Sequence, residues 1–169
     1  MHMHVRSLVR AAVLAALVCV ATMVIQIPSP LSGYMNMGDC FVLLAAVLLG
    51  PIWGTVAGGI GSMLADLLSG YAQYVPGTFV IKALMALLAA LIFRALSKRS
   101  STVAMLAGGL AAELWMVTGD FLYEATFLQY GLSAAAGIPG NLMQGAFGIV
   151  AGLLLYRLLV RMHAAPFRT

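Results

Sequence analysis

The sequence has very little charge. Only 8% of its 169 residues are Asp, Glu, Lys or Arg, whereas soluble domains usually carry about 25%. Hydrophobic residues make up 63% of the chain, and the mean hydropathy is +1.03. No polar stretch is long enough to form a soluble domain with its own core. This shortage of charge excludes a soluble globular protein and predicts one integral membrane domain, residues 1–169.

Several motifs of catalysis and metal binding are also missing. There is no glycine-rich loop ending in Lys-Ser or Lys-Thr, so any ATP-driven work must come from a partner. The apolar segments contain no Ser–His pair, and Asp66 and Asp120 lack a supporting aspartic-protease motif. The two cysteines, Cys19 and Cys40, match neither a disulfide framework nor a metal motif. We therefore expect no enzymatic activity, no cofactor and no metal.

The chain does have apolar runs, bounded by Gly, Pro or charged residues. Because about 20 apolar residues cross a bilayer as a helix, we predict an all-α bundle of six transmembrane helices. The second helix is short and would be tilted or extended by its flanks. Small residues at four-residue spacing favour close packing between helices. The predicted helices cover about 7–27, 39–49, 52–69, 77–96, 102–126 and 138–160.

Basic residues gather on one side of this predicted bundle. All Lys and Arg except Lys82 lie at the start of the first helix, around the connection between the fourth and fifth, or near the C-terminus. By the positive-inside rule, both termini are cytoplasmic. The basic residues are then markers of topology, so we expect no nucleic acid as a partner. His2 and His4 would also be cytoplasmic, away from the acidic residues.

Most acidic residues fall in the outer half of the predicted bundle. A charge at the bilayer centre costs about 2.5–3.5 kcal/mol on insertion scales, so it usually faces a bundle interior or a cavity. At helical spacing, three predicted helices carry polar stripes at this depth. These stripes are Lys82 on the fourth helix, Glu113, Asp120 and Glu124 on the fifth, and Asn141 with Gln144 on the sixth. Together they predict one cavity that opens to the outside.

Structural interpretations of the same residues stay open. Lys82 could form an ion pair with Asp66 that ties two helices together, which we favour, or it could contact a ligand. Asn141 and Gln144 could bond between helices, and Asp120 with Glu124 could be carboxylates in interfacial water. Tyr74 and Tyr123 could belong to the interfacial aromatic belt or stack on a planar ligand.

The stretches MGDCFVLLAAVLLGPIWGTVAGGIGSMLADLLSGY (37–71) and YVPGTFVIKALMALLAALI (74–92) carry a family resemblance. With the six predicted segments and the alanine pairs of the first helix, they resemble the substrate-binding S components of energy-coupling factor (ECF) vitamin transporters. The resemblance implies a multi-pass protein of a prokaryotic plasma membrane. It also implies that a vitamin binds in the outer half of the bundle, beneath a lid formed by the loop after the first helix.

The resemblance further implies partners and site residues. A transmembrane coupling protein, driven by two cytoplasmic ATPases, would pack on the first helix, and the loaded S component would topple within the bilayer. The interface residues are then Ala11, Ala12, Ala15 and Ala16. The candidate substrate-binding residues are Asn36, Tyr74, Lys82, Glu113, Asp120, Tyr123, Glu124, Asn141 and Gln144.

A carboxylate-lined pocket favours a ligand with hydrogen-bond donors or partial positive charge. We therefore expect a small heteroaromatic vitamin or precursor of the pyridoxine, hydroxymethylpyrimidine or thiamine type. Riboflavin or another vitamin is the alternative within the family. The alternative of another class is a stand-alone proton-coupled secondary carrier with Asp66, Lys82 and Glu113 as a relay.

Overall fold

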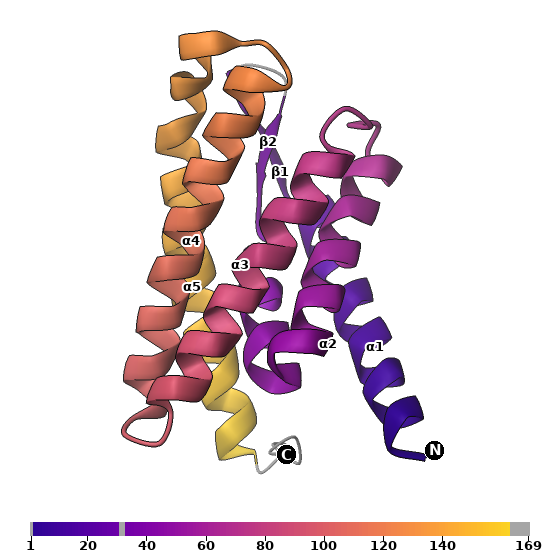
Figure 1. Ribbon diagram of the computed structural model, residues 1–169, viewed down its shortest axis with the longest axis vertical. Coiled ribbons are helices and arrows are strands. Elements are labelled where there is room, and N and C mark those ends of the chain that lie inside the picture. Colours follow the sequence, from indigo (N-terminus) through magenta and orange to yellow (C-terminus); the bar gives the residue numbers. More distant parts are fainter. Residues whose placement is uncertain (1, 31–32, 163–169) are drawn as a thin grey trace.

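The computed structural model describes residues 2–30 and 33–162 of the chain. Within these residues, five helices are long and apolar enough to cross a membrane. A short strand pair follows the first helix, and a 3-10 helix precedes the last (Figure 1). The elements are α1 (His2–Val24), β1 (Gln26–Pro28), β2 (Tyr34–Asn36), α2 (Asp39–Leu68), α3 (Val75–Leu96), α4 (Ser101–Thr126), η1 (Gly131–Gly137) and α5 (Ile138–Arg161).

Helix α2 is broken near its middle. Gly50 has φ 76° and ψ −174°, which is not helical, and Pro51 follows it. Glycine adopts a positive φ without a steric penalty, and proline cannot continue the hydrogen bonds of a preceding helix. The break lies where we predicted the boundary between the second and third helices. Helices α1, α3, α4 and α5 correspond to the other four predicted segments.

The two halves of α2 pack against each other. A β carbon added to Gly54 would lie 2.7 Å from Cα of Ala46, and one added to Gly58 would lie 3.0 Å from Cγ1 of Val42. In a straight helix, positions 42 and 58 would be about 24 Å apart. The chain therefore folds back at Gly50. This fold returns Asp39, the first residue of α2, toward the end of the molecule where α2 finishes.

The segment after α1 differs from the predicted loop. Helix α1 ends at Val24, three residues earlier than we expected, because residues 26–28 form strand β1. Strands β1 and β2 are antiparallel, and Ile27 is paired with Met35. Pro28 is paired with Tyr34 at the end of the two strands. The predicted lid is thus a β-hairpin rather than an irregular loop.

The ends of the helices divide into two groups (Figure 1). The first turn of α1, the α3–α4 connection and the last turn of α5 lie at one end of the molecule. The side chain of Arg157 in α5 donates a hydrogen bond to Thr102 in α4 (Nη2 to Oγ1, 3.2 Å). The α2–α3 connection and η1 lie at the opposite end (Figure 1). The predicted grouping of basic residues at one end agrees with this arrangement.

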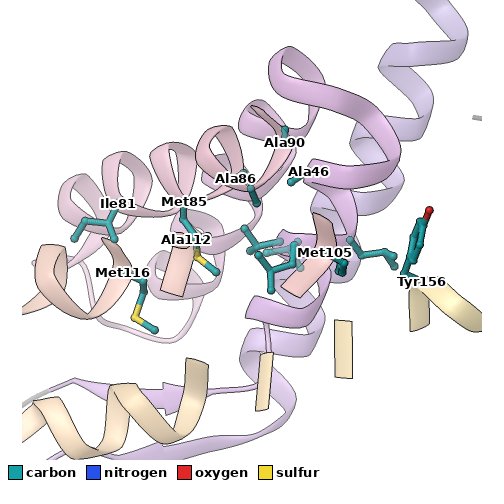
Figure 2. Close-up of a cluster of buried hydrophobic side chains, with 14 of the residues drawn as sticks. Ala46, Ile81, Met85, Ala86, Ala90, Met105, Ala112, Met116 and Tyr156 are labelled. Carbon is teal, nitrogen blue, oxygen red and sulfur yellow. The ribbon is translucent and has the colours of Figure 1, made fainter. Parts of the chain in front are cut away.

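The core lies between α2, α3 and α4, with Tyr156 from α5 at its edge (Figure 2). Met85 and Met116 are completely buried in it. Small residues let the helices approach closely: a β carbon on Gly108 of α4 would lie 3.0 Å from the carbonyl oxygen of Ala89 in α3. Large apolar side chains on the outer faces remain exposed, as expected for helices that contact lipid.

Candidate functional site

A polar cavity lies among the β-hairpin and all five long helices. Its volume is about 50 Å³. Seven of the nine predicted binding residues line it: Asn36, Tyr74, Lys82, Asp120, Glu124, Asn141 and Gln144. The other lining residues are Thr22, Ser29, Gly33, Tyr34, Ser62, Asp66 and Thr78.

Lys82 forms a buried ion pair with Asp39, through Nζ and Oδ1. Lys82 is 5% exposed and Asp39 is 1% exposed. The predicted pair between Lys82 and Asp66 is therefore wrong. The physical reason is the fold of α2, which brings Asp39 from its first turn against α3. Sequence proximity favoured Asp66, but sequence proximity does not show which residue faces Lys82.

Gln144 joins this ion pair to the hairpin. Its Nε2 donates to Oδ2 of Asp39 (2.6 Å), and its Oε1 accepts from the backbone N–H of Asn36 in β2 (2.8 Å). The two oxygens of Asp39 thus accept from α3 and α5 respectively. One continuous set of hydrogen bonds links α3, α2, α5 and the strand that covers the cavity.

Asp66 is instead bonded to the hairpin. The hydroxyl of Tyr34 donates to Oδ1 of Asp66 (2.5 Å). Burial of the Tyr34 hydroxyl, followed by the nearby charge of Asp66, raises the pKa of Tyr34 well above its ordinary value. Tyr34 therefore remains a hydrogen-bond donor at physiological pH. Both carboxylates of α2 hold the hairpin in place, Asp66 directly and Asp39 through Gln144.

Helix α4 contributes two carboxylates to the cavity wall. Glu124 is buried and accepts from the hydroxyl of Tyr74 (Oε1, 3.1 Å). Oδ2 of Asp120 accepts a longer bond from the side-chain amide of Asn141 (3.4 Å). These carboxylates face the bundle interior rather than bulk water. The predicted stripe on this helix therefore does point inward.

Glu113, another predicted binding residue, is not among the residues that line the cavity. It packs against α5: a β carbon on Gly148 would lie 2.6 Å from Oε1 of Glu113 and 3.0 Å from Cβ of Asp39. The side chain is 4% exposed, and neither carboxyl oxygen has a hydrogen-bond partner among the described residues. Two glycines, Gly145 and Gly148, leave the space that its carboxyl group fills.

Tyr123 is also absent from the cavity wall. Its hydroxyl donates to the backbone carbonyl of Gln73 (2.8 Å), and its ring lies over Gly77 at the start of α3. It thereby ties α4 to the α2–α3 connection. It belongs to a row of rings whose successive centroids are 4.7–6.5 Å apart: Tyr34, Tyr71, Tyr74, Tyr123 and Phe127.

Sequence reasoning missed several wall residues. Thr22 is 3% exposed, lines the cavity, and has no hydrogen-bond partner for its hydroxyl among the residues described. Ser62 is another small polar residue within an apolar helix. Such interruptions are the only signal in the sequence that could have identified them. Among the described residues, no group of three or more His, Cys, Asp or Glu side chains could hold a metal ion.

The four alanines of α1 divide between two faces. Ala11 is 4% exposed and packs with Ala45 and Ala57 of α2. Ala12 and Ala16, one turn apart, are exposed. Ala15 is half-buried, and its carbonyl oxygen faces Gly61 of α2. Ala11 was also predicted as an interface residue, but α2 already covers its side chain.

A family model described as "ECF-type riboflavin transporter, S component" matches residues 2–161. The chain belongs to this family of S components. The family is one of transporter subunits and not of enzymes. S components are integral to the prokaryotic plasma membrane, bind a vitamin, and associate with membrane-embedded coupling and ATPase modules.

Two similar proteins extend the comparison. A protein of Pyrococcus woesei described as "Uncharacterized protein in gap 3'region" is 34% identical over 137 residues, which is 80% of this chain and 88% of that protein. A solved structure, titled "Structure and mechanism of the S component of a bacterial ECF transporter", superposes with a TM-score of 0.74 at 24% identity. The match covers 94% of this chain and 98% of that one, so this S component has the same fold.

Proposed function

We propose that this S component captures a small heteroaromatic vitamin or precursor from outside the cell and delivers it with an ATP-driven coupling module. The observation that supports the proposal most strongly is the polar cavity under the β-hairpin. It gathers side chains from five helices at the end of the molecule opposite the basic residues. In the proposed topology, the two halves of α2 count as separate segments, both termini are cytoplasmic, and the cavity faces outward.

The charges around the cavity favour a ligand without negative charge. Asp66, Asp120 and Glu124 all line it, whereas the ammonium group of Lys82 is already paired with Asp39. Carboxylates accept hydrogen bonds from donors and repel anions. Pyridoxine, hydroxymethylpyrimidine and thiamine satisfy this condition, and an anion such as pantothenate does not.

The cavity must widen before such a ligand can enter. A volume of about 50 Å³ holds roughly three or four water molecules. The hairpin is the element that can move, because it is held to the helices mainly by side-chain bonds. These bonds join Tyr34 to Asp66, Asn36 to Gln144, and Gln26 to Ser69. We propose that it acts as the lid.

Riboflavin is the second candidate substrate, and the description of the matching family supports it. Riboflavin is uncharged and its ribityl chain carries several donors, so it too satisfies the charge condition. It is larger and would need a wider opening. The small size of the cavity therefore favours the smaller compounds, and the family description favours riboflavin.

One experiment decides between the candidate substrates. The protein is purified gently and the retained small molecule is identified by mass spectrometry. Riboflavin, thiamine, pyridoxine, hydroxymethylpyrimidine and pantothenate are then titrated into the ligand-free protein by calorimetry. We expect one of the three smaller compounds to bind at least tenfold more tightly than the rest; tightest binding of pantothenate would contradict the charge argument.

For coupling, we propose that the exposed Ala12–Ala16 face of α1 contacts the coupling protein, with Ala15 at its edge. The whole transporter would contain two ATPases, and the loaded S component would topple to release its ligand inward. Ala16→Leu should abolish assembly and leave ligand affinity unchanged, with Val24→Leu, an exposed position two turns further along α1 and off the Ala12–Ala16 face, as the control. Gradient-driven uptake by the purified chain alone in liposomes would favour the stand-alone carrier instead.

A further inference from the structure

We infer that Glu113 is the proton-binding site of a switch on the β-hairpin: while Glu113 carries a proton, the hairpin stays closed over the cavity, and loss of that proton releases it. The inference rests on the proposed function in one respect, because it takes the hairpin to be the lid. It goes beyond that function because the switch needs neither a ligand nor the coupling module.

Glu113 is a carboxylic acid in the middle of α4 without a donor to compensate its charge. The side chain is 4% exposed, and neither oxygen has a hydrogen-bond partner among the described residues. Met116 and Val117, one turn further along α4, belong to the apolar core. An ionised carboxylate buried without donors is strongly disfavoured, whereas the neutral acid is tolerated. Glu113 therefore carries a proton while the hairpin is closed.

Packing alone does not explain a carboxyl group at this position. Its space is left by two glycines of α5: a β carbon on Gly145 would lie 3.2 Å from Oε2 of Glu113, and one on Gly148 would lie 2.6 Å from Oε1. A leucine or methionine would fill such a space without the cost of removing a carboxyl group from water. Ionisable residues inside membrane-spanning helices usually mark a function.

The groups that act electrostatically on Glu113 come from three helices. They are Asp39 of α2, Lys82 of α3 and Asp120 of α4 itself, and the thiol of Cys40 in α2 is also within range. The part of α5 that covers Glu113 contributes no charged side chain. Because Lys82 is already paired with Asp39, an ionised Glu113 would add an uncompensated negative charge beside this pair.

Asp39 connects Glu113 to the hairpin. Both side chains lie against the same glycine of α5. Asp39 accepts a hydrogen bond from Gln144, which in turn accepts one from the backbone N–H of Asn36 in β2. An ionised Glu113 would repel Asp39 and attract the ammonium group of Lys82. The bonds that join β2 to α5 would then weaken.

The direction of the pH dependence follows from the number of bound protons. The closed hairpin keeps Glu113 dry and protonated. Opening breaks the bonds around Asp39 and admits water, which lets the carboxyl group ionise, so the open state holds one proton fewer. The closed state is therefore favoured at low pH and loses this stability as the pH rises. For one proton, the equilibrium constant for opening rises by up to about tenfold per pH unit.

The first test is isotope-edited infrared spectroscopy of the full-length protein in a detergent without ester groups. The chain contains two glutamates, Glu113 and Glu124, so carboxyl-labelled glutamate in the Glu124→Gln variant reports on Glu113 alone. We expect the C=O band of a protonated acid at neutral pH and its conversion to a carboxylate band at alkaline pH. A carboxylate band at neutral pH would overturn the inference.

The second test is hydrogen exchange of the Asn36 backbone amide without ligand, corrected for the intrinsic exchange rate at each pH. Protection should fall as the pH rises in the wild type and in Glu113→Asp, which keeps an ionisable group. It should stay constant in Glu113→Gln, which is neutral like the protonated acid. The amide of Arg99, bonded to the carbonyl of Leu96 at the other end of the molecule, is the control and should show no pH dependence.

Two results of the exchange test would contradict the switch. If Asn36 keeps its pH dependence in Glu113→Gln, or shows none in the wild type, Glu113 does not control the hairpin. If Glu124→Gln removes the dependence, the proton is bound at Glu124 instead. The infrared test does not require Glu113→Gln to fold. Both tests are done without ligand, so failure of every candidate vitamin to bind would count against the proposed function alone.

Discussion

Two buried regions of this protein differ in what fills them. Around Met85 and Met116, the space between α2, α3 and α4 is closed by methionine, alanine and aliphatic side chains. Directly beside this region, Asp39, Lys82 and Gln144 are nearly as buried, yet Lys82 and Gln144 line a cavity and Asp39 is bonded to both of them. The apolar region is held by close contact of backbones, and the polar region by a few directional bonds. The apolar region is therefore suited to act as a rigid scaffold, and the polar region can rearrange around a ligand.

The largest expected effect is the loss of the buried ion pair. Lys82→Ala leaves Asp39 charged and uncompensated in the bundle, and breaking a buried pair from one side costs about 3–5 kcal/mol. We expect a large fall in the unfolding temperature in detergent. The double variant Lys82→Met with Asp39→Asn should recover most of the lost unfolding temperature, because neither residue is then left as an unpaired buried charge. If Lys82→Ala and the double variant lower the unfolding temperature equally, the charge pairing of Lys82 with Asp39 is not what stabilises the polar region.

The apolar region should be most sensitive at its glycines. In Gly54→Ala, the new β carbon would lie 2.7 Å from Cα of Ala46, and a backbone atom cannot move aside cheaply. Overpacking of this kind costs about 1–3 kcal/mol. Gly152→Ala is the control, because its β carbon meets the flexible end of Met105 at 3.3 Å. In thermal unfolding, Gly54→Ala should have a lower unfolding temperature than Gly152→Ala. Similar unfolding temperatures would contradict close backbone packing within α2.

A smaller effect, on binding alone, is expected at Thr22. Thr22→Val keeps the side-chain shape and removes a buried hydroxyl that has no partner among the described residues. Stability should therefore stay the same or rise. If the hydroxyl bonds the ligand, affinity should fall about tenfold, which corresponds to about 1.4 kcal/mol. Calorimetry with the tightest-binding vitamin tests this, and unchanged affinity would remove Thr22 from the site.

The smallest effect is expected at Glu113. Glu113→Gln keeps the volume of a side chain that lies between α4 and α5 but off the cavity wall. We expect ligand affinity to change by less than about threefold, which corresponds to less than about 0.7 kcal/mol. Asn141→Ala changes a residue on the cavity wall and serves as the comparison. Its ligand affinity should fall at least tenfold. If Glu113→Gln weakens ligand binding as much as Asn141→Ala does, the ligand site reaches deeper into the bundle than the cavity wall.

Most of the helical fold could be predicted from the sequence. Apolar runs, Gly50–Pro51 and the distribution of Lys and Arg indicated the spans, the break in α2 and the shared end of the termini. The β-hairpin was not predicted, because three-residue strands carry too little periodicity to recognise. The polar stripes identified most of the cavity wall, since helical spacing places such residues on one face.

The sequence by itself determined that this is a membrane protein whose few charges must meet inside a bundle, because lipid cannot solvate them. Only the tertiary structure decided which charges meet. Lys82 is paired with Asp39, 43 positions away, and Asp66 is bonded to Tyr34. The reason is that α2 folds back at Gly50. A local sequence pattern does not predict which face of residues 39–49 then packs against α3.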